Sequence, residues 1–238
     1  MTDKQFEGRY AQKDGDFFKN HYPFDENFIR AEINPEKYIS DNEKDFEIYL
    51  NNEIEKAILT TDAKIIIVDN ITYLRNETEK AKNALPLMKQ LKALKNKFGL
   101  SILALAHTPK RDLSKPISKN DLQGSKMLIN FCDSAFSIGE SFKEADLRYL
   151  KQIKVRNCAL HYHTENVLLC QIVKPSNFLY FDLLQMVSEQ EHLRQISNTE
   201  RKEMIEKAKE LSANGKSQRE IALETELSLA TVNRYLKK

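Results

Sequence analysis

One uninterrupted apolar run organises the first part of this chain. Residues 64–70 read K-I-I-I-V-D-N, four β-branched residues in a row followed by an acid. A short continuous apolar run is typical of a strand buried on both faces, as in a parallel sheet covered by helices. We therefore predict a buried strand over 64–69. Asp69 falls at its carboxyl end, the edge where ligands bind in open α/β sheets.

Helical periodicity flanks this run on both sides. Residues 45–60 place apolar side chains on one helical face, and so do residues 79–98, which Gly99 ends as a C-cap. Pro86 restricts the regular part of the second helix to about residue 83 onward. A second apolar run, 100–106, predicts another buried strand that ends at His107. With a strand over 27–33, this alternation predicts an α/β fold with a mostly parallel, doubly wound sheet.

Further along the chain, strands are predicted in quick succession. They cover residues 134–138, 147–155, 166–173 and 178–184, and short helices are predicted over 4–10 and 126–131. The last three strands leave no room for crossover helices. We therefore expect them to be antiparallel, on the far edge of the same sheet.

The pattern changes from residue 188. Residues 188–198 are polar and predict a linker between a domain over 1–187 and a small all-α domain over 199–238. Three amphipathic helices are expected there, over 199–213 with Thr199 as N-cap, 217–224 and 229–236. Their apolar positions are those at which a helix-turn-helix packs its two helices together. These positions are Ile221, Ala222, Leu227, Val232 and Leu236.

The last predicted helix presents polar side chains suited to base edges and phosphates: Ser228, Thr231, Asn233 and Arg234. This stretch resembles the helix-turn-helix of site-specific resolvases and related regulators, which implies DNA as a partner. A small three-helix protein-interaction module is the alternative. Residues 199–238 hold nine Lys or Arg and seven Glu, a net charge of +2. One copy should therefore bind DNA weakly and in a salt-sensitive way.

Composition narrows the class of protein. Of 238 residues, 30% are charged and 41% hydrophobic, which indicates a soluble globular protein. The net charge is only +2, so any nucleic-acid surface must be local. The cysteines, Cys132, Cys158 and Cys170, are odd in number and widely spaced. They argue against a disulfide framework, and we expect a cytoplasmic protein. No apolar run approaches the roughly 20 residues of a membrane span.

Four motifs in order connect the α/β part with a known family. They are I-I-I-V-D-N at 65–70, L-A-L-A-H-T at 103–108, a basic loop reaching D-L-Q-G-S-K at 121–126, and L-K-Q-I-K-V-R-N at 150–157. Together they resemble the second half of a RecA-like ATPase, of the branch that includes hexameric plasmid replicative helicases. The resemblance covers about residues 3–181. It implies a RecA-like, mostly parallel sheet with antiparallel edge strands, a ring-shaped homo-oligomer, and ATP and Mg²⁺ as cofactors of the full-length family.

The resemblance also implies roles for individual residues. Asp69 would order Mg²⁺ and water, Asn70 would lie beside the nucleotide, and His107 would sense the γ-phosphate. Lys154 and Arg156 are separated by one residue on a strand, so both point to one side. In the family such a pair reaches the phosphate of the neighbouring subunit's nucleotide. The alternatives are an Asp that starts a turn, a His bonded to a carbonyl, and two solvated cations.

The basic loop over 108–126 would face the central channel of the ring and contact single-stranded DNA. Its cationic residues are Lys110, Arg111, Lys115, Lys119 and Lys126. A solvated mobile loop is the alternative.

One family motif is absent from the sequence. No phosphate loop of the form G-x-x-x-x-G-K-S/T occurs, and the G-K-S at 215–217 has no preceding glycine or strand. We therefore expect a truncated or mis-started form of a longer ATPase, which binds ATP weakly at best and does not hydrolyse it. The implied function is ATP-driven work on DNA in replication or mobilisation of a plasmid or other mobile element. A non-enzymatic DNA-binding regulator is the alternative, and an unrelated α/β domain with an interaction tail is a third.

Overall fold

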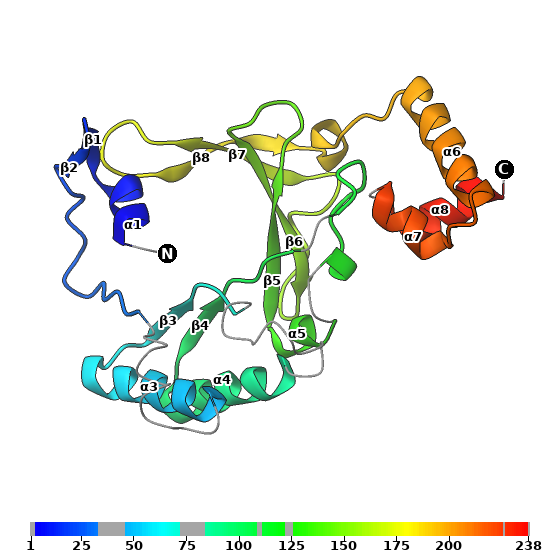
Figure 1. Ribbon diagram of the computed structural model, residues 1–238. Helices are drawn as coiled ribbons and strands as arrows, with labels where there is room; N and C mark the ends of the chain where they lie inside the picture. Colours follow the sequence, from blue (N-terminus) through cyan, green and yellow to red (C-terminus); the bar gives the residue numbers. More distant parts are fainter. Residues whose placement is uncertain are drawn as a thin grey trace.

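The computed structural model describes residues 3–32, 46–71, 84–108, 111–121, 126–225 and 227–237. Within these residues the chain is mixed α/β and forms three separate sheets (Figure 1). One is the hairpin β1–β2, one is the parallel pair β3–β4, and one has the order β5-β6-β7-β8. The single, mostly parallel sheet expected from the sequence is therefore wrong for the described residues.

The parallel pair carries two helices on one face. The elements run α3 (Phe46–Thr61), β3 (Ile65–Val68), α4 (Ala84–Phe98) and β4 (Ser101–Ala104), as the apolar periodicity predicts. Gly99 has a φ of +65° just after α4, the left-handed conformation that glycine adopts at low cost. The helices and strands share two small cores. The first contains Leu50, Ile71, Leu87, Met88, Leu91 and Leu128, and the second contains Ile58, Leu94 and Leu100.

The prediction that β3 is buried on both faces is wrong. Ile66 and Val68 pack against the helices, but Ile65 is 69% exposed and Ile67 is also exposed. Leu103 pairs with Ile67 on the neighbouring strand and is exposed as well. The physical reason is that α3 and α4 cover one face of the pair, and no other described residue covers the second. An apolar run does not distinguish a strand with one covered face from a strand with two.

The four-stranded sheet is wholly antiparallel. It comprises β5 (Ser134–Glu140), β6 (Leu147–Val155), β7 (Val167–Val173) and β8 (Tyr180–Val187). The antiparallel pairing was predicted for the last three strands, but their place on the edge of the parallel sheet is wrong. β5, predicted as a strand over 134–138, is the fourth strand of this sheet.

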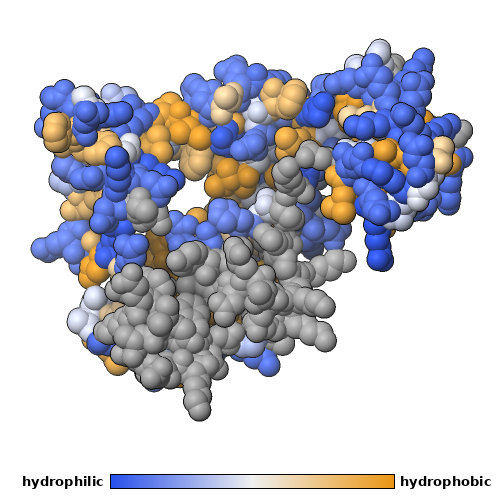
Figure 2. All heavy atoms as spheres, in the orientation of Figure 1, coloured by the Kyte–Doolittle hydropathy of each residue, from blue (hydrophilic) through white to orange (hydrophobic). Residues whose placement is uncertain are grey.

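The two faces of this sheet differ. On one face Tyr149 is fully buried opposite Gly139, where an added Cβ would lie 2.2 Å from the tyrosine ring. On the other, an apolar row crosses all four strands in register: Ile138, Leu150, Leu168 and Met186. Ile138 and Met186 at its ends are exposed, and Figure 2 shows hydrophobic side chains gathered over β7 and β8.

A buried ion pair holds a loop against the first face of the sheet. Lys151 Nζ of β6 lies 2.5 Å from Glu189 Oε2 of η3 (Glu189–His192). The backbone N–H of Ile117 donates to Glu189 Oε1, and its carbonyl accepts from Lys151 Nζ, both at 2.7 Å. Ile117 itself packs on Tyr149 and Val167. The segment predicted as a polar linker therefore contains a fully buried acid.

The N-terminal segment packs at the turn between β7 and β8. It contains the predicted short helix, α1 (Asp3–Tyr10), and a hairpin of β1 (Gln12–Asp14) and β2 (Phe17–Lys19). Lys174 Nζ donates to the carbonyl of Gly8 within the helix and to that of Ala11 directly after it. An aromatic cluster joins the parts: Phe6, Tyr10, Tyr22, Phe24, Phe28 and Phe178. The strand predicted over 27–33 is wrong for residues 27–32, which form no strand, and residue 33 lies outside the described residues.

Three helices form a compact bundle at the C-terminus, as predicted. They are α6 (Asn198–Ala213), α7 (Gln218–Glu224) and α8 (Leu229–Leu236). The N-cap of α6 is Ser197, which forms a capping box with Glu200, so the prediction of Thr199 is wrong. All five predicted core residues lie in the bundle core, together with Ala208 and Tyr235, which the pattern did not single out. Among the described residues, no helix is long and apolar enough to cross a membrane.

Glu189→Gln is expected to lower the free energy of unfolding by about 3–5 kcal/mol, because it leaves Lys151 charged and buried without its counterion. Urea unfolding of the full chain measures the change. Glu191→Gln is the matched control, since Glu191 pairs with Lys143 at 3.3 Å on the surface. Its change should stay below about 1 kcal/mol. Equal effects of the two substitutions would contradict this account of the buried pair.

Candidate functional site

The ends of the parallel strands bring together two of the predicted site residues. Asn70 Nδ2 donates to His107 Nε2 at 2.9 Å. The backbone N–H of Ile71 donates to the carbonyl of Leu105 at 2.8 Å, so pairing continues past the strands and fixes the two ends side by side. Asp69 directly follows β3 and is exposed at this edge. The three residues therefore form one small polar site.

This strand-end site offers oxygen and nitrogen groups to a ligand from solvent. Among the described residues, no group of three or more His, Cys, Asp and Glu side chains could hold a metal ion. A single exposed carboxylate suits Mg²⁺, which keeps several waters and binds through one or two carboxylates and the phosphates of a substrate. Asp69 therefore offers one exposed carboxylate to a ligand from solvent.

Lys154 and Arg156 do point to one side of the sheet, as their spacing predicts. Lys154 Nζ donates to the carbonyls of Ile129 and Asn130, at 2.6 and 3.2 Å. Arg156 donates to the Asn130 carbonyl at 2.7 Å and pairs with Asp133 at 3.2 Å. Both cations therefore lie at the C-terminal end of α5 (Lys126–Phe131), where a helix attracts positive charge. Neither contacts Asp69 within the described part of the chain.

Lys154, Arg156 and Asp133 form a charged cluster at the end of α5, and their charges act on one another. Burial, followed by the neighbouring Arg156, lowers the pKa of Lys154. The hydrogen bond and charge of Lys95 hold the pKa of the Asp133 carboxyl below its usual value, and Arg156 adds to this effect. Two like charges are thus kept together by one carboxylate and the last carbonyls of a helix.

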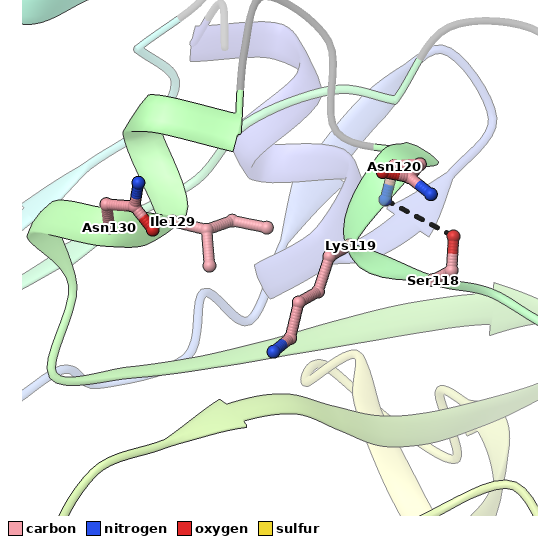
Figure 3. A pocket seen from close by; sticks show the side chains of 5 residues that line it. All are labelled: Ser118, Lys119, Asn120, Ile129 and Asn130. Carbon is pink, nitrogen blue, oxygen red and sulfur yellow. Dashed lines mark hydrogen bonds between the residues drawn. The ribbon is translucent and has the colours of Figure 1, made fainter.

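A surface pocket of about 480 Å³ lies beside this cluster. Its walls come from α5 and from the neighbouring turn η2 (Lys119–Asp121), and Ile129 points from α5 toward η2 (Figure 3). The lining residues are Ser118, Lys119, Asn120, Ile129 and Asn130. Lys119 also lowers the pKa of Lys154 through its charge. Of the lining residues, sequence reasoning named Lys119 alone, because asparagines in a loop and a short helix carry no pattern.

The predicted channel loop is attached to the sheet over much of its length. Arg111 donates to the carbonyl of Lys115 at 2.7 Å and to the Tyr149 hydroxyl at 3.4 Å. Lys115 pairs with Asp112 at 2.8 Å. The buried ion pair of Lys151 and Glu189, which binds the backbone of Ile117, acts as a clamp on this loop. Together with the clamp, these contacts make residues 111–117 a packed segment instead of a solvated one. Lys110 lies outside the described residues, and so does the side chain of Lys126 at the start of α5.

The predicted DNA-reading face of α8 is open only in part. Asn233 and Arg234 are exposed, and Ser228 is the exposed N-cap. Thr231 is only 5% exposed, so its prediction as an exposed residue is wrong. Its hydroxyl bonds to Ser228 Oγ at 2.8 Å and accepts from Lys115 Nζ at 3.1 Å. A helical pattern does not reveal this contact, because Lys115 lies more than a hundred residues earlier in the chain.

No protein-family model matches the sequence, and no curated protein matches it.

Lys154→Met should lower the free energy of unfolding by about 0.5–1.5 kcal/mol, because the last carbonyls of α5 lose a donor. Thermal and urea unfolding both measure this loss. The matched control is Lys119→Met, an exposed lysine across the pocket, for which a change within about 0.5 kcal/mol is expected. If Lys154→Met were as stable as the control, the lysine would have no structural role at α5.

Proposed function

We propose that this chain is a RecA-like ATPase-family protein that acts on DNA in replication or mobilisation of a mobile element. The observation that carries the proposal is the contact between Asn70 and His107 at the carboxyl ends of adjacent parallel strands, beside exposed Asp69. That edge is where nucleotides bind in such sheets. The order of the four sequence motifs supports the same assignment.

In this proposal each side chain has a defined task. Bound Mg²⁺ would neutralise phosphate charge, and Asp69 would hold it through an oxygen or a water. Asn70 orients the imidazole of His107, whose other edge then contacts the terminal phosphate. Lys154 and Arg156 do not contact Asp69 in the described residues, which fits a role at the nucleotide of a neighbouring subunit in a ring-shaped, hexameric homo-oligomer.

The 238 residues contain no phosphate loop after a strand, so we propose weak nucleotide binding and no hydrolysis by this chain alone. Ile65, Ile67 and Leu103 form an exposed apolar face on the strands that lead into the site. This face supports dependence on a further polypeptide, which would cover it next to the site. A companion polypeptide or subunit with a phosphate loop would complete the cradle.

We also propose that α7 and α8 act as a helix-turn-helix on duplex DNA. Their packing through Ile221 and Val232 supports this, as do exposed Asn233 and Arg234 on the last helix. A non-enzymatic DNA-binding regulator is the second candidate. It is favoured by the missing phosphate loop and would bind DNA with no response to nucleotide.

The nucleotide proposal predicts weak, magnesium-dependent binding. A fluorescent ATP analogue should bind the chain with a Kd above about 100 µM, and no phosphate should be released. Asp69→Asn should abolish the magnesium dependence, because it removes the carboxylate. The matched control is Asp62→Asn, an exposed acid paired with Lys64 before β3, and it should behave as wild type. Micromolar affinity with turnover would overturn the claim that the chain cannot hydrolyse ATP.

The DNA proposal predicts a localised loss of affinity. Arg234→Ala should weaken duplex binding by about 1–3 kcal/mol for a base contact, or reduce the salt slope by about one for a phosphate contact. Fluorescence anisotropy over a salt series separates these two outcomes. Arg201→Ala, an exposed arginine on α6, is the charge-matched control and should have little effect. Equal behaviour of the two variants would favour the protein-interaction module instead.

A further inference from the structure

The first turn of α8 is docked on the α/β part of the same chain. Lys115 Nζ lies 3.1 Å from Thr231 Oγ1 and 3.5 Å from Ser228 Oγ. The backbone N–H of Arg194 donates to the carbonyl of Leu113 at 3.0 Å, so the chain that leads into α6 is bound to the same loop. Two independent contacts therefore hold the helical bundle against residues 111–117.

The loop that makes these contacts is itself firmly supported. Asp112 pairs with Lys115 and accepts hydrogen bonds from Ser114. Partial burial of Asp112 raises its pKa, but Lys115 and Ser114 outweigh this effect and the net pKa is lowered. Arg111 binds the carbonyl of Lys115, and the buried clamp fixes Ile117. Lys115 is thus presented to α8 from a fixed position.

The electrostatics of the contact between Lys115 and the first turn of α8 allow another group to replace it. A helix N-terminus carries partial positive charge, which attracts anions and disfavours a lysine ammonium. Here Asp112 offsets the charge of Lys115. A DNA phosphate at the same place would interact favourably with the helix end, which the lysine does not. An approaching polyanion can therefore replace an internal contact that is intrinsically weak.

We propose that Lys115, held by the loop over 111–117, forms an autoinhibitory cover over Thr231 in the first turn of α8, and that duplex DNA must displace Lys115 to reach Thr231. This inference rests on the proposed binding of DNA by α8. When a binding-competent form is only partly populated, the apparent affinity falls by that fraction. With the open form populated at about one-tenth, removing the cover tightens duplex binding about tenfold.

The test compares Lys115→Ala with Lys19→Ala in the full chain. Both substitutions remove one positive charge, and Lys19 lies on β2, paired with Asp14 at the opposite end of the molecule from α8 (Figure 1). The duplex affinity of Lys115→Ala should rise about tenfold over that of Lys19→Ala. Unchanged or weaker binding by Lys115→Ala overturns the cover, and weaker binding would make Lys115 a direct DNA contact.

A second measurement needs no DNA and separates the cover from the proposed function. Amide hydrogen exchange of residues 111–117 and 228–232 should speed up in Lys115→Ala and remain unchanged in Lys19→Ala. Unchanged exchange in both variants overturns the docking itself, whatever DNA does. Faster exchange without duplex binding by any variant overturns the proposed DNA-binding function, and the inference fails with it. Faster exchange with equal duplex affinity overturns only the inhibitory role.

Discussion

The buried ion pair between Lys151 and Glu189 is the interaction on which the arrangement of the chain depends. Removing two charges from water costs several kcal/mol for each ion, and the pair offsets this cost through mutual attraction and two hydrogen bonds to the backbone of Ile117. It joins β6, η3 and the loop over 111–117 in one place. The chain leaving η3 then meets the same loop at Leu113 through Arg194, so the position of the helical bundle follows from the clamp.

Local periodicity was sufficient to predict most of the helices and strands, because each is specified by its own residues. The bounds of the helices α3, α4 and α8 and of the strand β6 lie near those that were predicted. The pairing of sheets was not predictable in the same way. Whether β5 pairs with β4 or β6 is decided by residues far apart in sequence, and the run of 65–68 is compatible with one covered face or two. Glu189 resembled a linker residue because Lys151, its partner, lies 38 positions earlier.

In the candidate site, too, local features could be predicted and contacts between distant segments could not. Asn70 and His107 could be predicted to lie together, since the carboxyl ends of neighbouring parallel strands share one edge. The spacing of Lys154 and Arg156 gave their common direction but not their target, the end of α5. The burial of Thr231 depends on packing that includes a contact with a remote loop, so a helical pattern could not reveal it.

The cations for which the family resemblance implies contacts with phosphates or DNA already have partners inside the chain. Arg156 pairs with Asp133 and Lys115 with Asp112, and neutral acceptors complete the contacts. Lys154 and Arg156 bind carbonyls of α5, and Lys115 binds two hydroxyls of α8. A phosphate oxygen carries negative charge and therefore adds a Coulomb attraction that a neutral carbonyl or hydroxyl lacks, so a phosphate can compete for each of these side chains. Under the proposed function, ligand binding is then an exchange of partners. A nucleotide would replace contacts at the end of α5, and DNA would replace the contact of Lys115 with α8. Lys119 lines the pocket beside the end of α5, where its charge acts on Lys154 and would also act on a bound phosphate.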